Sequence, residues 1–343
     1  MDLLSMTLSE LEEFIVSLGE KKFRAKQLYG WMLKGESLEN MSNLPKSLVQ
    51  LIKSQELYYV PQIERKYVSA IDGTVKYLFR MFDGQMIESV VMSYEHGYTI
   101  CVSCQCGCRM GCKFCASTIA GKVRDLSAGE ILSQIIAAQR DLGIRISNIV
   151  MMGIGEPLDN YDNTIKFLKL VSDENNLNIG SRHISVSTCG VVDNIYELAK
   201  EKLGITLSIS LHAYADEVRS AIMPVNKKWN IDALLTSCAS YFRTTGRRIS
   251  FEYTLIQGVN DSEQGALSLA AVLKKYMKDM PLHVNLIPVN DVKERDFKAT
   301  EKNAAIKFMN TLNKNGVNAT IRRKLGSDIN ASCGQLRREE SKK

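Results

Sequence analysis

The chain has 343 residues, of which 45% are hydrophobic and 24% are charged, and its formal net charge is +6. This composition supports a large apolar core, which excludes an intrinsically disordered chain, and the mild positive charge is compatible with a polyanionic partner. No apolar run approaches the ~18 residues of a membrane span, and the acidic N-terminus lacks the regions of a signal peptide, so we expect a cytoplasmic protein with no membrane partner.

The first predicted elements are short helices over residues 7–53. Thr7 and Ser9 can each cap the first of them, because Glu10 and Glu12 follow three positions later and apolar residues then repeat at helical spacing. The segment RAKQLYGWMLK predicts a second helix, and a third follows the sequence NLP. We therefore expect a small helical accessory domain over residues 1–57.

Residues 58–98 differ in character, because β-rich runs replace the helical spacing. Two Asp-Gly pairs, which begin at Asp72 and Asp83, lie between alternating apolar and polar runs. Asp-Gly between such runs is a strong signal for a hairpin turn. A β-hairpin extension is therefore expected here.

From residue 99 onward, short β-rich runs alternate with helical segments. The runs are TICVSC, SNIVMMG, HISVST, ITLSISLH, ISFEYTLI and LHVNLIPVN, with VNATIRR as a candidate seventh. Such alternation predicts repeated βα units around a parallel sheet. About six units are too few for a closed eight-fold barrel. We therefore expect an α/β fold with an open, partial barrel of six βα units over residues 99–320. A C-terminal segment, residues 321–343, follows it. A doubly wound sheet is the alternative.

Unusual residues follow each of the six predicted strands. The first strand leads into a cysteine cluster, and the others lead into GIGEP, STCG, SLH, GVND and PVN. In parallel α/β architectures, ligands bind at the carboxyl ends of the strands. Each loop alone could be ordinary turn chemistry, but six loops in phase with the strands predict a single site.

The stretch CVSCQCGCRMGCKFC, residues 101–115, contains six of the nine cysteines. Cys108, Cys112 and Cys115 have the spacing C-x3-C-x2-C, and no other three cysteines of the stretch have it. Thiolates are soft ligands that select zinc or iron–sulfur clusters. Structural zinc sites usually have four ligands in two pairs, with the second pair elsewhere in the chain, but outside this stretch Cys189, Cys238 and Cys333 are isolated. An iron–sulfur cluster with one open iron is therefore the first hypothesis, and zinc is the alternative.

This triplet, with Phe114 before its last cysteine, resembles the signature of the radical S-adenosylmethionine (SAM) superfamily, and GIGEP resembles the loop of that superfamily that binds the methionine amino group. The resemblance implies a 4Fe–4S cluster held by three cysteines. It also implies S-adenosylmethionine as the second cofactor, bound at the open iron.

A closer resemblance covers nearly the whole chain. KKFRAKQLYGWM, MMGIGEPLDN, VSTCGVV, SLHAYADEVRSAIMPVNKKWNI, HVNLIPVN and DINASCGQL are similar to segments of the dual-specificity methyltransferases that act on carbon 2 of adenine in 23S ribosomal RNA and transfer RNA. The related enzymes that methylate carbon 8 and confer antibiotic resistance are the alternative, but GEPL followed by STCGVV favours carbon 2. Cys104 and Cys189 stand where the family usually has serine.

The resemblance implies a covalent relay that consumes two S-adenosylmethionine molecules per turnover. The first methylates Cys333, and a 5′-deoxyadenosyl radical from the second activates that methyl group for addition to the base. Cys101 then releases the product by forming a transient disulfide with Cys333. The resemblance assigns Glu88 as the proton acceptor, although the sequence alone describes Glu88 as a solvated strand carboxylate and both cysteines as packed side chains.

The resemblance also supplies the expected contacts with S-adenosylmethionine. They are Gly155, Glu156, Ser187, Ser210, Leu211, His212 and Asn290. Short polar side chains and exposed backbone at strand ends suit an amino acid and a ribose. We expect the remaining cysteines, namely Cys104, Cys106, Cys189 and Cys238, to be structural.

The implied partners are 23S rRNA, at the peptidyl transferase centre, and tRNA, at the anticodon loop. An electron donor such as a flavodoxin or ferredoxin is also implied, and we expect a monomer. The N-terminal helices and the basic segment TIRRKLG, residues 320–326, are the candidate RNA contacts. A non-enzymatic, zinc-containing RNA-binding module is the alternative outside the enzymes.

Overall fold

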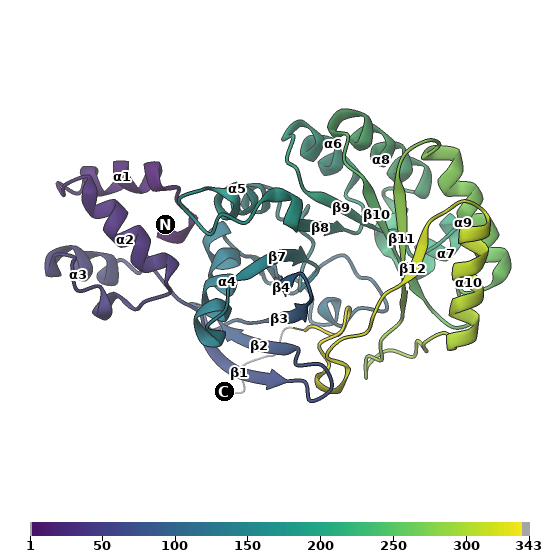
Figure 1. Cartoon of the computed structure of the whole chain (residues 1–343), viewed down its shortest axis with the longest axis horizontal. Helices are drawn as coiled ribbons and strands as arrows, with labels where there is room; N and C mark the ends of the chain where they lie inside the picture. The colour runs from purple at the N-terminus through teal and green to yellow at the C-terminus, as the bar shows by residue number, and fades with distance from the viewer. Residues whose placement is uncertain (1, 338–343) are drawn as a thin grey trace.

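A computed structural model of the chain describes residues 2–337 (Figure 1). The part of the predicted C-terminal segment beyond residue 337 lies outside the described residues. A helical lobe at the N-terminus joins a larger α/β body, in which helices cover the outside of a curved sheet (Figure 1). None of the helices within residues 2–337 is long and apolar enough to cross a membrane.

The N-terminal lobe contains α1 (Leu8–Ser17), α2 (Phe23–Leu33) and α3 (Lys46–Ser54). Of the two candidate caps of the first helix, Thr7 is confirmed and Ser9 is wrong, since Ser9 lies inside α1: the Glu10 N–H donates to Thr7 Oγ1 at 3.2 Å, and the Thr7 N–H donates to Glu10 Oε2 at 2.7 Å. These two bonds satisfy backbone donors that a helix start would otherwise leave unpaired.

The start of the chain packs against α4 (Ala128–Leu142), so it ties the lobe to the body. Ser127 Oγ donates to Asp2 Oδ2 at 2.7 Å, and the Gly129 N–H donates to Ser5 Oγ at 2.8 Å. A β-carbon at Gly129 would lie 2.2 Å from the Asp2 carboxylate, so only glycine permits this close approach.

The central sheet has ten described strands in the order β1-β2-β3-β4-β7-β8-β9-β10-β11-β12. Pairing is parallel from β4 through β12, and the predicted β-rich runs, including the seventh, all form strands. The bounds of these parallel strands are β4 (Gly97–Cys101), β7 (Ile146–Met151), β8 (Ile184–Thr188), β9 (Thr206–Ser210), β10 (Ile249–Leu255), β11 (Leu282–Pro288) and β12 (Ala319–Ile321). A separate two-stranded ribbon is formed by β5 (Gln105–Cys106) and β6 (Arg124–Asp125).

The strand order decides between the two predicted architectures. A doubly wound sheet reverses its order at a switch point, whereas here each parallel strand pairs with the next one in the chain. Right-handed crossovers in one constant direction place the helices on one face and curl the sheet. The partial barrel is therefore confirmed, and the doubly wound alternative is wrong. The remaining helices of its outer layer are α5 (Tyr161–Ser172), α6 (Val192–Lys200), α7 (Asp216–Ile222), α8 (Ile231–Thr245), α9 (Glu263–Tyr276) and α10 (Lys302–Lys314).

The predicted β-hairpin extension forms β1 (Gln62–Val68), β2 (Val75–Arg80) and β3 (Met86–Tyr94). These strands are antiparallel, and glycines with positive φ angles follow Asp72 and Asp83 in the two turns. Because β3 also pairs with β4, the extension continues the barrel sheet and is not a separate sheet.

Candidate active site

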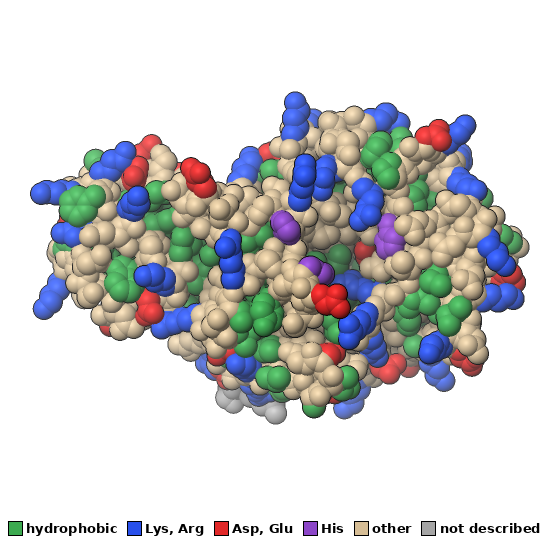
Figure 2. Space-filling model, in the orientation of Figure 1, with side chains coloured by type: hydrophobic (Ala, Val, Ile, Leu, Met, Phe, Trp, Pro, Cys, Tyr) green, Lys and Arg blue, Asp and Glu red, His purple; other side chains and the backbone are tan. Residues whose placement is uncertain are grey.

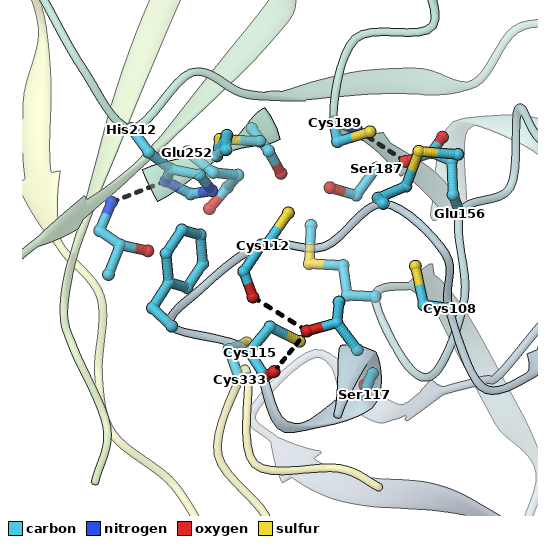
Figure 3. A pocket seen from close by; sticks show the side chains of 18 of the residues that line it. Cys108, Cys112, Cys115, Ser117, Glu156, Ser187, Cys189, His212, Glu252 and Cys333 are labelled. Atoms are coloured by element: carbon cyan, nitrogen blue, oxygen red, sulfur yellow. Dashed lines mark hydrogen bonds between the residues drawn. The ribbon is translucent and has the colours of Figure 1, made fainter. Parts of the chain in front are cut away.

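The loops at the carboxyl ends of the parallel strands surround one cavity with about 940 Å³ of space, part of which is open to solvent (Figure 3). It contains ten of the thirteen predicted site residues. These are Cys108, Cys112, Cys115, Gly155, Glu156, Ser187, Ser210, His212, Asn290 and Cys333. The other three, Leu211, Cys101 and Glu88, do not line it. Five of the six predicted loops contribute to the lining. The sixth, GVND, does not line the cavity, but its Asn260 binds the backbone of the lining residue His212.

The three cysteines of the C-x3-C-x2-C triplet come from one loop, and their side chains lie around the same space (Figure 3). Thr118 Oγ1 stabilises this loop by donating to the carbonyl oxygens of Cys112 and Cys115, each at 3.0 Å. Burial raises the pKa of the Cys108 thiol to about 12 and also raises the pKa values of the Cys112 and Cys115 thiols. These thiols become ligands only when a metal centre stabilises their thiolates.

The GIGEP loop brings a buried carboxylate to the cavity. Glu156 Oε1 accepts from the Leu158 N–H at 3.0 Å, and Oε2 accepts from the Cys189 N–H at 2.7 Å. Burial raises the pKa of this carboxyl group, and these donors oppose the rise. A β-carbon at Gly155, which has a φ of +112°, would lie 2.7 Å from the Gln105 side chain, so the loop needs glycine there.

His212 lies in a left-handed backbone conformation, with a φ of +56°. The Thr254 N–H donates to its Nδ1 at 2.8 Å, so the neutral ring carries its proton on Nε2. Burial lowers its pKa to about 3, which keeps the ring neutral at physiological pH. Asn260, from the GVND loop, donates to the His212 carbonyl oxygen at 2.7 Å, and the Phe114 ring lies edge-on at 5.0 Å. The imidazole is thus held as a hydrogen-bond donor.

Arg219 is a fully buried cation that sequence reasoning missed. Its guanidinium donates to the carbonyl oxygens of Cys189 at 2.7 Å, Ser210 at 3.0 Å and Leu211 at 3.0 Å, and to Asn226 Oδ1 at 3.0 Å. It therefore joins the loops that follow β8 and β9. A basic residue on the buried face of α7 was the available signal, since Ile222, three positions later, is also buried.

Buried Glu252 and partly buried Arg322 form a second charged group in the cavity wall. Glu252 was missed from sequence, and Arg322 belongs to the segment 320–326 that was predicted only as an RNA contact. Glu252 accepts from Asn285 Nδ2 at 2.9 Å and from Ser250 Oγ at 3.2 Å, and the Arg322 guanidinium lies 3.7 Å from its carboxylate. Burial raises the pKa of Glu252, while Arg322 opposes the rise. A glutamate inside the apolar run ISFEYTLI was the signal for this group.

Cys333 belongs to the C-terminal loop and lines the cavity beside Cys115 (Figure 3). Asn290 Nδ2 donates to the Cys333 carbonyl oxygen at 3.0 Å, and Gln335 anchors the loop by donating to the Asp291 carbonyl oxygen at 2.9 Å. Cys101, at the end of β4, is also a free thiol. Burial raises the pKa of Cys101 to about 12, and the neighbouring Cys333 contributes to the rise. Two cysteines far apart in the sequence are therefore close in space.

Glu88 lies outside the cavity, and the interpretation of it as a solvated carboxylate is wrong. It is 2% exposed, because the C-terminal loop covers it. Its carboxylate lies 3.0 Å from Lys76 Nζ and accepts from the Arg337 N–H at 2.7 Å. Lys76 also donates to the Asn330 carbonyl oxygen at 3.3 Å. The Lys76–Glu88 pair therefore holds both sides of the loop that carries Cys333.

The chain matches two family models. The model of the Radical SAM superfamily covers residues 102–270, and that of the ribosomal RNA large subunit methyltransferase N-terminal domain covers residues 1–56. Among curated proteins, the probable dual-specificity RNA methyltransferase RlmN of Clostridium novyi (strain NT) is 52% identical over 339 residues, which is 98% of each chain. The protein of the same name from Alkaliphilus oremlandii (strain OhILAs) is 54% identical over 339 residues, again 98% of each chain. This chain belongs to the RlmN family.

A solved structure supports this membership in three dimensions. A radical SAM methyltransferase from Sphaerobacter thermophilus aligns with a TM-score of 0.92 and 41% sequence identity, covering 98% of this chain and 99% of that one. The α/β body and the helical N-terminal lobe are thus both features shared with a known radical SAM methyltransferase. As a member of the RlmN family, the chain is a radical SAM enzyme, and membership of this superfamily implies an iron–sulfur cluster and S-adenosylmethionine.

Proposed function

We propose that this chain methylates carbon 2 of an adenine in 23S rRNA, at the peptidyl transferase centre, and in the anticodon loop of tRNA. One observation carries the proposal: Cys333 lies in the same cavity as Cys108, Cys112 and Cys115, and it is near enough to Cys101 to raise the pKa of that thiol. An enzyme that only cleaved S-adenosylmethionine would not need a second pair of thiols there. The family membership supports RNA as the substrate.

The donor set fits a 4Fe–4S cluster, since three thiols face one cavity and thiolates are the ligands such clusters take. Within residues 2–337, no three His, Cys, Asp or Glu side chains are arranged around a single metal-ion position. Cys108, Cys112 and Cys115 would hold the cluster and leave one iron open. The cluster with S-adenosylmethionine supplies a one-electron source, a methyl group and an organic radical.

The chain's own polar groups would orient the second cofactor. Glu156 offers a carboxylate to an amino group, and His212 offers its Nε2–H to an oxygen or nitrogen acceptor. Ser187, Ser210 and Asn290 line the same space and can bind carboxylate or ribose oxygens. Leu211 acts through its backbone, because its carbonyl oxygen accepts from Arg219 and its N–H donates to the Glu252 carbonyl oxygen at 3.1 Å.

The two further cysteines would carry the methyl group and release the product. Cys333, as a thiolate, takes a methyl group in the first half-reaction, and its carbon becomes bonded to the base in the second. The Cys101 thiolate then attacks the Cys333 sulfur, so a disulfide forms, the carbon–sulfur bond breaks, and the released carbon takes a proton to become the methyl group. Reduction of this disulfide restores both thiols. Two S-adenosylmethionine molecules are consumed in each turnover.

Glu88 would accept the proton that leaves carbon 2 of the base. Its present partners, Lys76 and the Arg337 N–H, hold it against the C-terminal loop. Proton transfer therefore requires this loop to move, and the same movement would give Cys333 access to both cofactor and base.

We further propose that residues 1–57 and 320–326 contact RNA, that a flavodoxin or ferredoxin donates the electron, and that the enzyme acts as a cytoplasmic monomer. The assay is anaerobic reconstitution followed by incubation with fragments of 23S rRNA and tRNA, with the methylated position located by mass spectrometry. Product at carbon 2 is expected. Product only at carbon 8 would assign the enzyme to the related resistance activity, and a colourless zinc protein that never cleaves S-adenosylmethionine would overturn the proposal.

A further inference from the structure

A second cavity adjoins the one described above, and the proposed function gives it no role. It lies between the end of β3 and the residues that follow β11 and β12, where the molecule is hollowed between the two ends of the sheet (Figure 2). Arg322, Asn290 and Cys333 line both cavities. Cys333 therefore forms part of the wall between a space that contains the cluster ligands and a space that does not.

The lining of the second cavity suits a flat heteroaromatic ring. Its walls include the apolar side chains of Met92, Ile287, Val289 and Leu325, and the ring of Tyr94. Tyr94 is half-buried and stacks on His96, with ring centroids 5.2 Å apart and planes 16° apart, so the phenol ring is held in one orientation. Enzymes that modify a base take it out of the stack and hold it between aromatic and apolar side chains.

The outer part of the same cavity is basic. Arg323 and Lys324 line it, and both are exposed. They follow directly after Arg322, which lies deeper and points toward Glu252 and Met152. A wall that is apolar and aromatic inside and cationic outside matches a nucleotide, whose base is apolar on its faces and whose flanking phosphates are anionic.

We propose that this second cavity receives the unstacked target adenine, with the base against Tyr94 and the flanking phosphates on Arg323 and Lys324. This inference rests on the proposed function and specifies its substrate subsite. Cys333 would then accept the methyl group on the cluster side, and the same loop movement that uncovers Glu88 would let it present this group to the base in the adjoining cavity. Burial raises the pKa of Tyr94, and both Cys101 and Cys333 contribute, which supports the proximity of the ring to both thiols.

The test measures the binding of two RNA hairpins to the anaerobically reconstituted full-length enzyme. One hairpin carries the target adenine, and the other carries an abasic site at that position, so the ratio of their Kd values isolates the contribution of the base. Stacking contributes about 1–3 kcal/mol per base, so Tyr94→Ala should reduce the preference for the adenine hairpin by about 5- to 150-fold. Tyr94→Phe should retain it, as should the control Tyr98→Ala, which removes a partly exposed tyrosine from β4.

The phosphate contacts predict a different pattern. A double variant, Arg323→Ala with Lys324→Ala, should weaken both hairpins equally and lower the slope of log Kd against log salt by about 1–2, because fewer counterions are released. Arg243→Ala, which removes an exposed cation from α8, is the matched control and should change neither value.

A third measurement separates failure of this inference from failure of the proposed function. Methylation of Cys333 in the absence of RNA, read by mass spectrometry of the protein, should be unchanged in Tyr94→Ala, which also shows that the variant folds. A wild-type enzyme that methylates no RNA contradicts the proposed function. A wild-type enzyme that methylates RNA, with a Tyr94→Ala variant that keeps the full preference for adenine, overturns the second cavity as the base site.

A filling substitution provides an independent variant in case Tyr94→Ala does not fold. Ala299 is exposed and lines the second cavity but not the first, so Ala299→Phe should block the base while S-adenosylmethionine still binds. Unchanged RNA methylation by Ala299→Phe would also overturn the inference.

Discussion

Arg219 offers the sharpest test of how the loops of the active site are held. Arg219→Ala removes the donors to three backbone carbonyl oxygens, on Cys189, Ser210 and Leu211, at a position with no exposure to solvent. A buried acceptor left without a donor costs about 1–3 kcal/mol, and the cavity left by the side chain adds to this cost. We expect the free energy of unfolding to fall by about 4 kcal/mol, near the upper end of the usual range for single substitutions.

The same substitution should weaken S-adenosylmethionine binding more than RNA binding, because Ser187 and Ser210 lie at the ends of β8 and β9, next to the two loops that Arg219 joins. The assays are urea unfolding followed by circular dichroism and equilibrium binding of S-adenosylmethionine to the reconstituted enzyme. Arg219→Lys keeps the charge but cannot reach all three carbonyl oxygens, so it should recover only part of the stability. Arg243→Ala, on the exposed face of α8, is the control and should change the free energy of unfolding by less than about 0.5 kcal/mol.

A loss below about 1 kcal/mol in Arg219→Ala, with unchanged S-adenosylmethionine affinity, would refute this reasoning. It would mean that water or a rearranged loop satisfies the carbonyl oxygens at no cost. A large loss of stability with unchanged affinity would refute only the link to the cofactor.

Three further predictions concern other parts of the site. The pKa of His212 is lowered from 6.5 to about 3 in the folded chain, so below pH 6.5 a proton binds to the unfolded chain but not to the folded one, and the free energy of unfolding falls. Between pH 6.5 and pH 5, the free energy of unfolding measured in urea should fall by about 1.5 kcal/mol more in the wild type than in His212→Asn. Cys101→Ala should accumulate a covalent enzyme–RNA adduct on denaturing gels and Cys333→Ala should form none, and free turnover by the Cys333 variant would contradict the relay. Lys76→Met removes the buried Lys76–Glu88 ion pair and the Lys76 hydrogen bond to the Asn330 carbonyl oxygen, so hydrogen exchange over residues 325–337 should become at least tenfold faster. Unchanged exchange would show that the pair does not hold the loop.

Much of the fold could be predicted because its signals are local. The β-rich runs became strands, and Thr7 with Glu10 formed the expected cap. Glu88 shows where local reasoning fails: a glutamate on a strand is usually solvated, but its partners here are Lys76 on the next strand and the Arg337 N–H near the other end of the chain. Arg219 was missed for the same reason, since its acceptors lie in loops that only the folded barrel brings together.

The sequence by itself determined the chemistry of the proposed cluster ligands and the positions of the loops, because the spacing of Cys108, Cys112 and Cys115 and the alternation of strands and helices are properties of neighbouring residues. Only the tertiary structure decided which distant groups meet. The curl of the sheet brings the segment after β12 back beside β3 and β4, so Cys333 approaches Cys101 and stands between two cavities. Contacts of this kind depend on strand order and curvature, which are set by the packing of the whole barrel and cannot be inferred from any single segment.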